Sequence, residues 1–257
     1  MRKALFSVLA AVAAAAMMAG GGASAATPAP APAPATTEDG PTVTFVNQSG
    51  ETLWIGSGVN ADGSENPGGL PAIEDGQQAT VTVPMSGGHW RGKFFGRQGC
   101  AGDDGSSFHC AIGDCGPSAG SCTTGEQPTS LAEFNFDPAD QLAPWYNVSY
   151  VNGVSTPITI DAAGSGAHSP RADCESVGCS EPLLQYCPPE NLTTDDSGKP
   201  VLCTNPSRDE KTPYSDAISS HCPLAYAWSK QDTEGGNQVV RQCAGCSGFT
   251  VTFHHPV

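Results

Sequence analysis

Residues 42–47 read Thr-Val-Thr-Phe-Val-Asn, and residues 249–253 read Phe-Thr-Val-Thr-Phe. In both runs, apolar residues alternate with threonine, which is the pattern of a strand with one buried face. Comparable β-prone runs occupy residues 80–83, 90–95, 146–151 and 158–160. Clusters of Gly, Asn, Asp, Ser and Pro separate them, as the turns of a sandwich require. The sequence therefore predicts an all-β sandwich.

Composition supports this fold class and excludes some partners. The chain has 31 glycines and 22 prolines, and only 14% of its residues are charged, a balance that favours turns and short strands. The formal net charge is −15. Because such a surface repels phosphate backbones, we expect no nucleic-acid partner.

The first 40 residues have the character of an export signal followed by a spacer. Arg2 and Lys3 precede an apolar run over residues 5–18, and Ala23-Ser24-Ala25 offers a small-x-small cleavage site. This run is shorter than the roughly 20 residues that cross a bilayer, so no membrane anchor is expected. Alternating Ala and Pro make residues 26–40 an extended linker. Residues 41–257 are then one secreted domain.

Residues 174–222 differ from the rest of the domain. They are rich in Cys, Pro and Asp and poor in alternating apolar residues. We interpret them as a loop-rich lobe held by disulfides rather than by a core, with a short helix beginning near residues 217–220.

Eleven cysteines imply disulfides in an exported chain, and their odd number leaves one thiol over unless two chains are joined. Spacing alone does not determine the pairing. Cys243, Cys246, His254 and His255 also have the residue types of a zinc site. In a secreted, cysteine-rich chain a disulfide at Cys243 is the favoured interpretation, so no metal or other cofactor is expected.

Several segments, in this order along the chain, resemble thaumatin-like proteins of the pathogenesis-related group 5 type. They are residues 42–47 with Trp54, 110–116 (CAIGDCG), 129–134 (TSLAEF), 147–153 (NVSYVNG) and 222–226 (CPLAY). The resemblance implies a disulfide-rich β-sandwich with the bridges Cys100–Cys110, Cys115–Cys122, Cys174–Cys243, Cys179–Cys222 and Cys187–Cys203. It leaves Cys246 as a free thiol in a monomer, or as the link in a disulfide-bonded dimer. Ser49 and His254 replace both partners of another family bridge.

The resemblance also implies a cleft between sandwich and lobe, which many members line with one Arg, one Glu and three Asp. Glu133 matches the family's Glu, whereas the Arg position holds Lys93. Asn147 and Asn152 stand at two of the acidic positions. The last acid falls on Gln231 without a gap, or on Asp232 with a shift of one residue.

These replacements decide which function is expected. Glycoside hydrolysis requires two carboxyl groups, whereas amides still exchange hydrogen bonds with sugar hydroxyls. We therefore predict a secreted protein that binds β-glucan or a related wall polysaccharide, with a defence or antifungal role. One alternative is an endo-β-1,3-glucanase that uses Glu133 and Asp232. Another is a protein-interaction or inhibitor module.

Two smaller expectations concern individual side chains. Glu133 is alternatively a surface acid that pairs with Lys93 or Arg97. Five aromatic residues are candidates for stacking on sugar rings, although strand residues of this kind usually belong to the core: Trp90, Phe94, Trp145, Tyr146 and Trp228.

Overall fold

The computed structural model describes residues 40–163, 174–236, 238–244, 246 and 248–257. The expected signal segment 1–25 and nearly all of the linker 26–40 lie outside these ranges. Within the described ranges, no helix is long and apolar enough to cross a bilayer.

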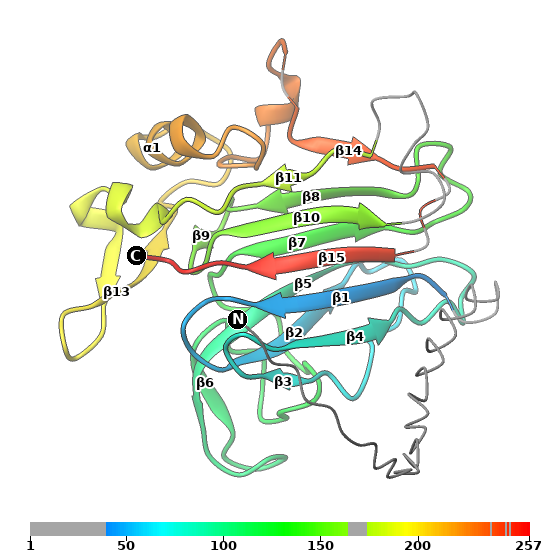
Figure 1. Cartoon of the computed structure of the whole chain (residues 1–257), viewed down its shortest axis with the longest axis horizontal. Coiled ribbons are helices and arrows are strands. Elements are labelled where there is room, and N and C mark those ends of the chain that lie inside the picture. The colour runs from blue at the N-terminus through cyan, green and yellow to red at the C-terminus, as the bar shows by residue number, and fades with distance from the viewer. Residues whose placement is uncertain (1–39, 164–173, 237, 245, 247) are drawn as a thin grey trace, which may run out of the picture. The chain divides into compact units, whose positions relative to one another are not determined.

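One face of the sandwich is a five-stranded sheet. Its order is β11 (Val177–Gly178), β10 (Ile158–Ala163), β15 (Gly248–Phe253), β1 (Thr42–Asn47) and β4 (Gln78–Thr82). β1 and β15 pair in parallel, with Thr42 opposite Gly248 and Asn47 opposite Phe253, so strands from the two ends of the domain lie side by side (Figure 1).

The second face is a larger sheet, which carries the residues of interest for function. Its order is β14 (Val240–Gln242), β8 (Trp145–Ser149), β7 (Leu131–Asn135), β5 (Arg91–Ala101), β2 (Leu53–Val59) and β3 (Ala72–Ile73), and β6 (His109–Ile112) pairs with β5. The expected strand over residues 90–95 thus extends to Ala101, because its second half forms a hairpin with β6 that Cys100–Cys110 crosslinks.

Aromatic side chains join the two sheets. Phe249 of β15 lies 5.3 Å from Phe134 of β7 and 5.1 Å from Tyr146 of β8, measured between ring centroids. Phe45 of β1 lies 5.1 Å from Phe94 of β5. All five side chains are buried. The predicted all-β sandwich is confirmed, and its core is the layer of inward-pointing residues of both sheets.

The lobe contains regular structure of its own. It comprises η1 (Leu183–Tyr186), η2 (Pro189–Asn191), β12 (Leu192–Thr194), β13 (Pro200–Thr204) and α1 (Pro213–His221). β13 pairs with β12 and with β9 (Gly153–Val154) in a three-stranded sheet. Further along the chain, η3 (Gln231–Thr233) precedes β14.

The expectation that the lobe lacks a core is wrong. Leu183, Leu184, Tyr214 and Ile218 are all at most 1% exposed and belong to the main hydrophobic cluster. Their irregular spacing in the sequence hides them, because 3₁₀ turns and one short helix, rather than strands, direct them inward. Helix α1 begins four residues before the expected 217, where the Thr212 side chain caps it.

Candidate functional site

A cleft of about 460 Å³ lies on the outer face of the larger sheet. Strand register places three polar residues in one row across this face, with Lys93 opposite Glu133 and Glu133 opposite Asn147. The period of two turns the residues that follow them, Phe94, Phe134 and Val148, into the core. The same alternation that builds the core therefore builds the floor of the cleft.

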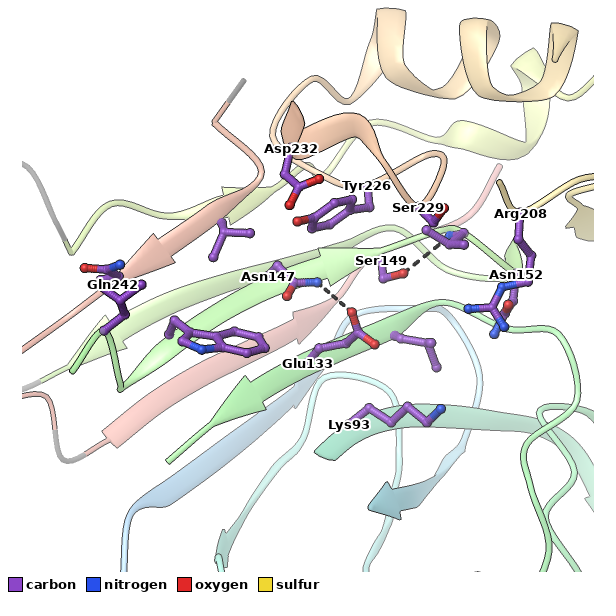
Figure 2. Close-up of a pocket in the computed structure, with 15 residues that line it drawn as sticks. Lys93, Glu133, Asn147, Ser149, Asn152, Arg208, Tyr226, Ser229, Asp232 and Gln242 are labelled. Atoms are coloured by element: carbon purple, nitrogen blue, oxygen red, sulfur yellow. Dashed lines mark hydrogen bonds between the residues drawn. The ribbon is translucent and has the colours of Figure 1, made fainter. Parts of the chain in front are cut away.

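Glu133 and Asn147 form a hydrogen-bonded pair on this floor. Asn147 Nδ2 donates to Glu133 Oε2 at 2.8 Å (Figure 2), and Asn147 is only 3% exposed. Burial raises the pKa of the Glu133 carboxyl. The hydrogen bond from Asn147 and the positive charge of Lys93 act in the opposite direction and lower this pKa. A carboxyl group in this environment retains its proton to higher pH than a solvated glutamate.

Neither cation suggested by the sequence forms an ion pair with Glu133. Lys93 Nζ instead contacts Glu126 Oε1 at 2.7 Å. Arg97 is fully buried beneath the sheet surface, where its guanidinium donates to the carbonyls of Ser118 and Ala119. The interpretation of Glu133 as half of a surface ion pair with either residue is therefore wrong.

The opposite wall of the cleft comes from the segment that follows the lobe. Tyr226 and Asp232 both line the cleft and lie across from Glu133 (Figure 2). Burial raises the pKa of the Tyr226 hydroxyl, and the charge of the nearby Asp232 raises it further. Glu133 and Asp232 thus share one cleft but stand on different elements, β7 and η3.

Gln231 does not line the cleft. It is 5% exposed, and its Oε1 accepts the backbone N–H of Ala227 at 2.7 Å. This contact holds η3 against the preceding turn and leaves the next residue, Asp232, directed at the cleft. Of the two alignments considered for the last acidic position, the structure places Asp232 in the lining.

Sequence reasoning missed several lining residues on the far side. Arg208 and Ser229 join the expected Asn152 there (Figure 2), and the Ser229 N–H donates to the Arg208 carbonyl at 2.8 Å. Among the described residues, the lining therefore holds two acidic residues, Glu133 and Asp232, and two basic residues, Lys93 and Arg208. This balance differs from the lining of one Arg, one Glu and three Asp that the resemblance implied for many family members.

Apolar side chains also line the cleft. They include Trp145, Leu142 and Val240, of which Leu142 is 57% exposed, and polar Gln242 stands opposite Trp145 in the sheet. Trp145 is half-buried, and its indole N–H donates to Asp140 Oδ2 at 3.1 Å, which fixes the ring. The other aromatic candidates are elsewhere: three are buried, and Trp228, outside the lining, packs against Lys211.

This arrangement has two chemical capabilities. An apolar ring beside amide and carboxyl groups can hold a sugar by its C–H face and its hydroxyl edge. A carboxyl with a raised pKa facing a second carboxylate can also supply an acid and a base to a glycosidic bond.

The described disulfides include every pairing implied by the resemblance, which are Cys100–Cys110, Cys115–Cys122, Cys174–Cys243, Cys179–Cys222 and Cys187–Cys203. Cys246, however, is not isolated, because Cys243 also lies within bonding distance of it. The two histidines considered as zinc ligands have other partners. His254 contacts Thr159 at 2.9 Å, and His255 contacts the Val257 carbonyl at 2.8 Å.

Comparison with known proteins identifies the family. The model of the Thaumatin family matches residues 47–213. Pathogenesis-related thaumatin-like protein 3.5 of Cryptomeria japonica is 31% identical over 241 residues, which cover 83% of this chain and 90% of the relative. A Prunus avium protein named glucan endo-1,3-beta-glucosidase is 26% identical over 234 residues, covering 82% and 89%. The solved structure of a laminaripentaose-producing β-1,3-glucanase in complex with laminaritetraose has a TM-score of 0.51 at 11% identity over 85% of this chain and 99% of that one, a likeness of fold alone. The chain therefore belongs to the thaumatin family.

Proposed function

We propose that the cleft binds a wall polysaccharide of the β-glucan type and that the protein acts in defence against organisms that carry it. The observation that carries this proposal is that one cleft lining holds the apolar side chains of Trp145 and Leu142 together with the hydrogen-bonded pair of Glu133 and Asn147. Pyranose rings present both kinds of surface, so each part of the cleft has a matching part of the ligand. The name of the Prunus avium relative supports the choice of a glucan.

A pull-down on insoluble β-1,3-glucan tests the binding. The wild-type protein should be retained, and Trp145→Ala should weaken retention roughly two- to tenfold, because specific aromatic packing contributes on the order of 0.5–1.5 kcal/mol. Trp228→Ala is the matched control, since this half-buried tryptophan lies outside the cleft lining. Equal retention of wild type and Trp145→Ala, or loss of retention in both variants, would reject the cleft as the binding site.

A second candidate function is slow endo-hydrolysis of the same polymer. It is favoured by one observation, that Glu133 and Asp232 line one cleft from different elements while burial raises the pKa of Glu133. Glu133 would protonate the leaving oxygen, and Asp232 would serve as base or nucleophile. Release of reducing sugar from soluble β-1,3-glucan should then disappear in Glu133→Gln and in Asp232→Asn, while binding persists. Binding without any release by the wild type would leave the protein a lectin-like binder.

We further infer that residues 1–25 are removed on export, that residues 26–40 form a spacer, and that residues 41–257 act outside the cell as a monomer. The basic start, the apolar run and the Ala23-Ser24-Ala25 site support export. N-terminal sequencing of the mature protein should begin at Ala26. An intact apolar run in the mature protein would refute processing.

A further inference from the structure

Three cysteines meet at the end of strand β14. The Sγ atoms of Cys174, Cys243 and Cys246 all lie within 4.8 Å of one another. Cys243 is within bonding distance of both others, and the sulfurs of Cys174 and Cys246 are 3.8 Å apart. Because one sulfur forms only one disulfide, these three residues hold one disulfide and one thiol.

The cluster accounts for the odd cysteine number. The other eight of the eleven cysteines form four separate bridges, namely Cys100–Cys110, Cys115–Cys122, Cys179–Cys222 and Cys187–Cys203. The unpaired thiol therefore lies beside a disulfide rather than alone. Attack of a thiolate on a neighbouring disulfide is the elementary step of thiol–disulfide exchange.

We propose that Cys174, Cys243 and Cys246 form a thiol–disulfide exchange site that reacts with external disulfides. The Cys246 thiolate attacks Cys243 Sγ, a Cys243–Cys246 bond forms, the Cys174–Cys243 bond breaks, and Cys174 leaves as the thiolate. The number of disulfides and thiols is unchanged, so this step needs no oxidant or reductant. Cys174 then attacks an external disulfide RSSR, forms the mixed disulfide Cys174–S–SR and releases RS⁻.

The different exposure of the three cysteines determines which one reacts with reagents in solution. Cys243 is fully buried and Cys246 is 7% exposed, whereas Cys174 is only half-buried. A thiol on Cys246 is shielded from reagents, and exchange transfers it to the one member of the cluster that solvent reaches more freely. Reactivity toward a small disulfide therefore appears at Cys174.

The segment that carries Cys174 stays anchored when its bond to Cys243 opens. The next residue, Glu175, accepts a hydrogen bond from Arg241 Nε at 3.1 Å, and its carbonyl accepts the Tyr146 hydroxyl at 2.7 Å. On the other side, the Cys243 N–H donates to the Pro144 carbonyl at 3.0 Å, and the Cys246 N–H donates to the Cys243 carbonyl at 3.1 Å. Both sides are held without the disulfide, so exchange proceeds without unfolding this region.

The test uses the intact, oxidised protein without denaturant. Acid quenching, which stops exchange by protonating thiolates, followed by digestion and mass spectrometry should yield both disulfide peptides, one joining Cys174 to Cys243 and one joining Cys243 to Cys246. Incubation with 5,5′-dithiobis(2-nitrobenzoate) should release one equivalent of thionitrobenzoate per chain. The mixed disulfide should lie on Cys174. A dimer linked through Cys174 in the absence of reagent would support the same site with a second copy as the partner.

Two variants serve as matched controls. Cys246→Ser confines the disulfide to Cys174–Cys243, and Cys174→Ser confines it to Cys243–Cys246, so both should fall to background release while retaining the four other bridges. Three results would overturn the proposal: a single disulfide peptide in the quenched wild type, an adduct on Cys246 alone, or a cluster recovered with all three cysteines reduced around a bound zinc ion. Each measurement is independent of glucan binding.

Discussion

Replacement of Asn147 by aspartate would put two carboxyl groups in contact on the floor of the cleft. Asn147 is 3% exposed, and its Nδ2 lies 2.8 Å from Glu133 Oε2. Aspartate has nearly the same shape, so the new oxygen takes the position of the amide nitrogen. The substitution removes the only donor that the structure gives to the Glu133 carboxylate among the described hydrogen bonds and substitutes an acceptor.

The distance of 2.8 Å between these two side chains sets the repulsion between the two carboxylates in the variant. Two full charges 2.8 Å apart repel by about 6 kcal/mol at an effective dielectric constant near 20, a large part of a typical total stability of about 5–15 kcal/mol. The pair avoids this by sharing one proton, as like-charged carboxyls do. Carboxyl groups in the unfolded chain lose their protons near pH 4. Above that pH the folded variant still holds the shared proton, so it binds more protons than the unfolded chain.

The sign of the pH dependence follows. A raised folded-state pKa gives stability that is complete below the unfolded pKa and is lost as pH rises. Relative to wild type, the variant should lose up to about 1.4 kcal/mol per pH unit once pH exceeds the point where wild-type Glu133 ionises. For a domain of this size, each kcal/mol lowers Tm by about 2–4 °C.

Thermal unfolding followed by circular dichroism from pH 4 to pH 8 measures this difference. Asn152→Asp is the control, because it adds an acid to the same cleft lining at a position with no described hydrogen bond to Glu133. Curves of Tm against pH that run parallel for wild type and Asn147→Asp would refute the reasoning.

Three further predictions concern stability. Phe249→Ala should cost about 3–5 kcal/mol in guanidinium unfolding, and Thr250→Ala on the opposite face of β15 about 0.5 kcal/mol or less; equal midpoints would contradict the sandwich core. Burial raises the pKa of Glu133, so its ionisation costs stability as pH rises. Glu133→Gln should therefore gain Tm over wild type from pH 4 to pH 8, and a constant difference would count against this. Burial lowers the pKa of His254, so the stability that its neutral form contributes is present above about pH 6.5 and lost as pH falls; His254→Gln should flatten that acid-side loss, and an unchanged profile would show that another group causes it.

Alternating strands were the part of the fold that the sequence made predictable. The runs at residues 42–47 and 249–253 became β1 and β15 because each has one face in the core and one in solvent. β2 and β7 were not predicted as strands, because their sequences, LWIGSGV and LAEFN, do not show a regular alternation of apolar and polar residues, and buried residues lie on both of their faces. Short runs that mix apolar and polar residues without a clear period do not distinguish a strand from other segments.

Some residues of the candidate site could also be predicted from the sequence, and others could not. Lys93, Glu133 and Asn147 could be grouped from the sequence through the family resemblance, and strand register places them in one row. Arg208, in the lobe, and Tyr226, just after it, line the cleft through a long-range arrangement that has no local signal in the sequence. The exchange cluster required the structure as well, since Cys174 is far from Cys243 and Cys246 in the sequence.

Strand β15, between β10 and β1, has a consequence for synthesis. Its residues, Gly248–Phe253, supply a central strand of the five-stranded sheet, so that sheet cannot close until the ribosome has translated them. Until then β1 and β10 present unpaired edges to any chaperone or protease nearby. A message truncated before codon 248 would thus yield a chain whose unpaired strand edges cellular quality control can recognise.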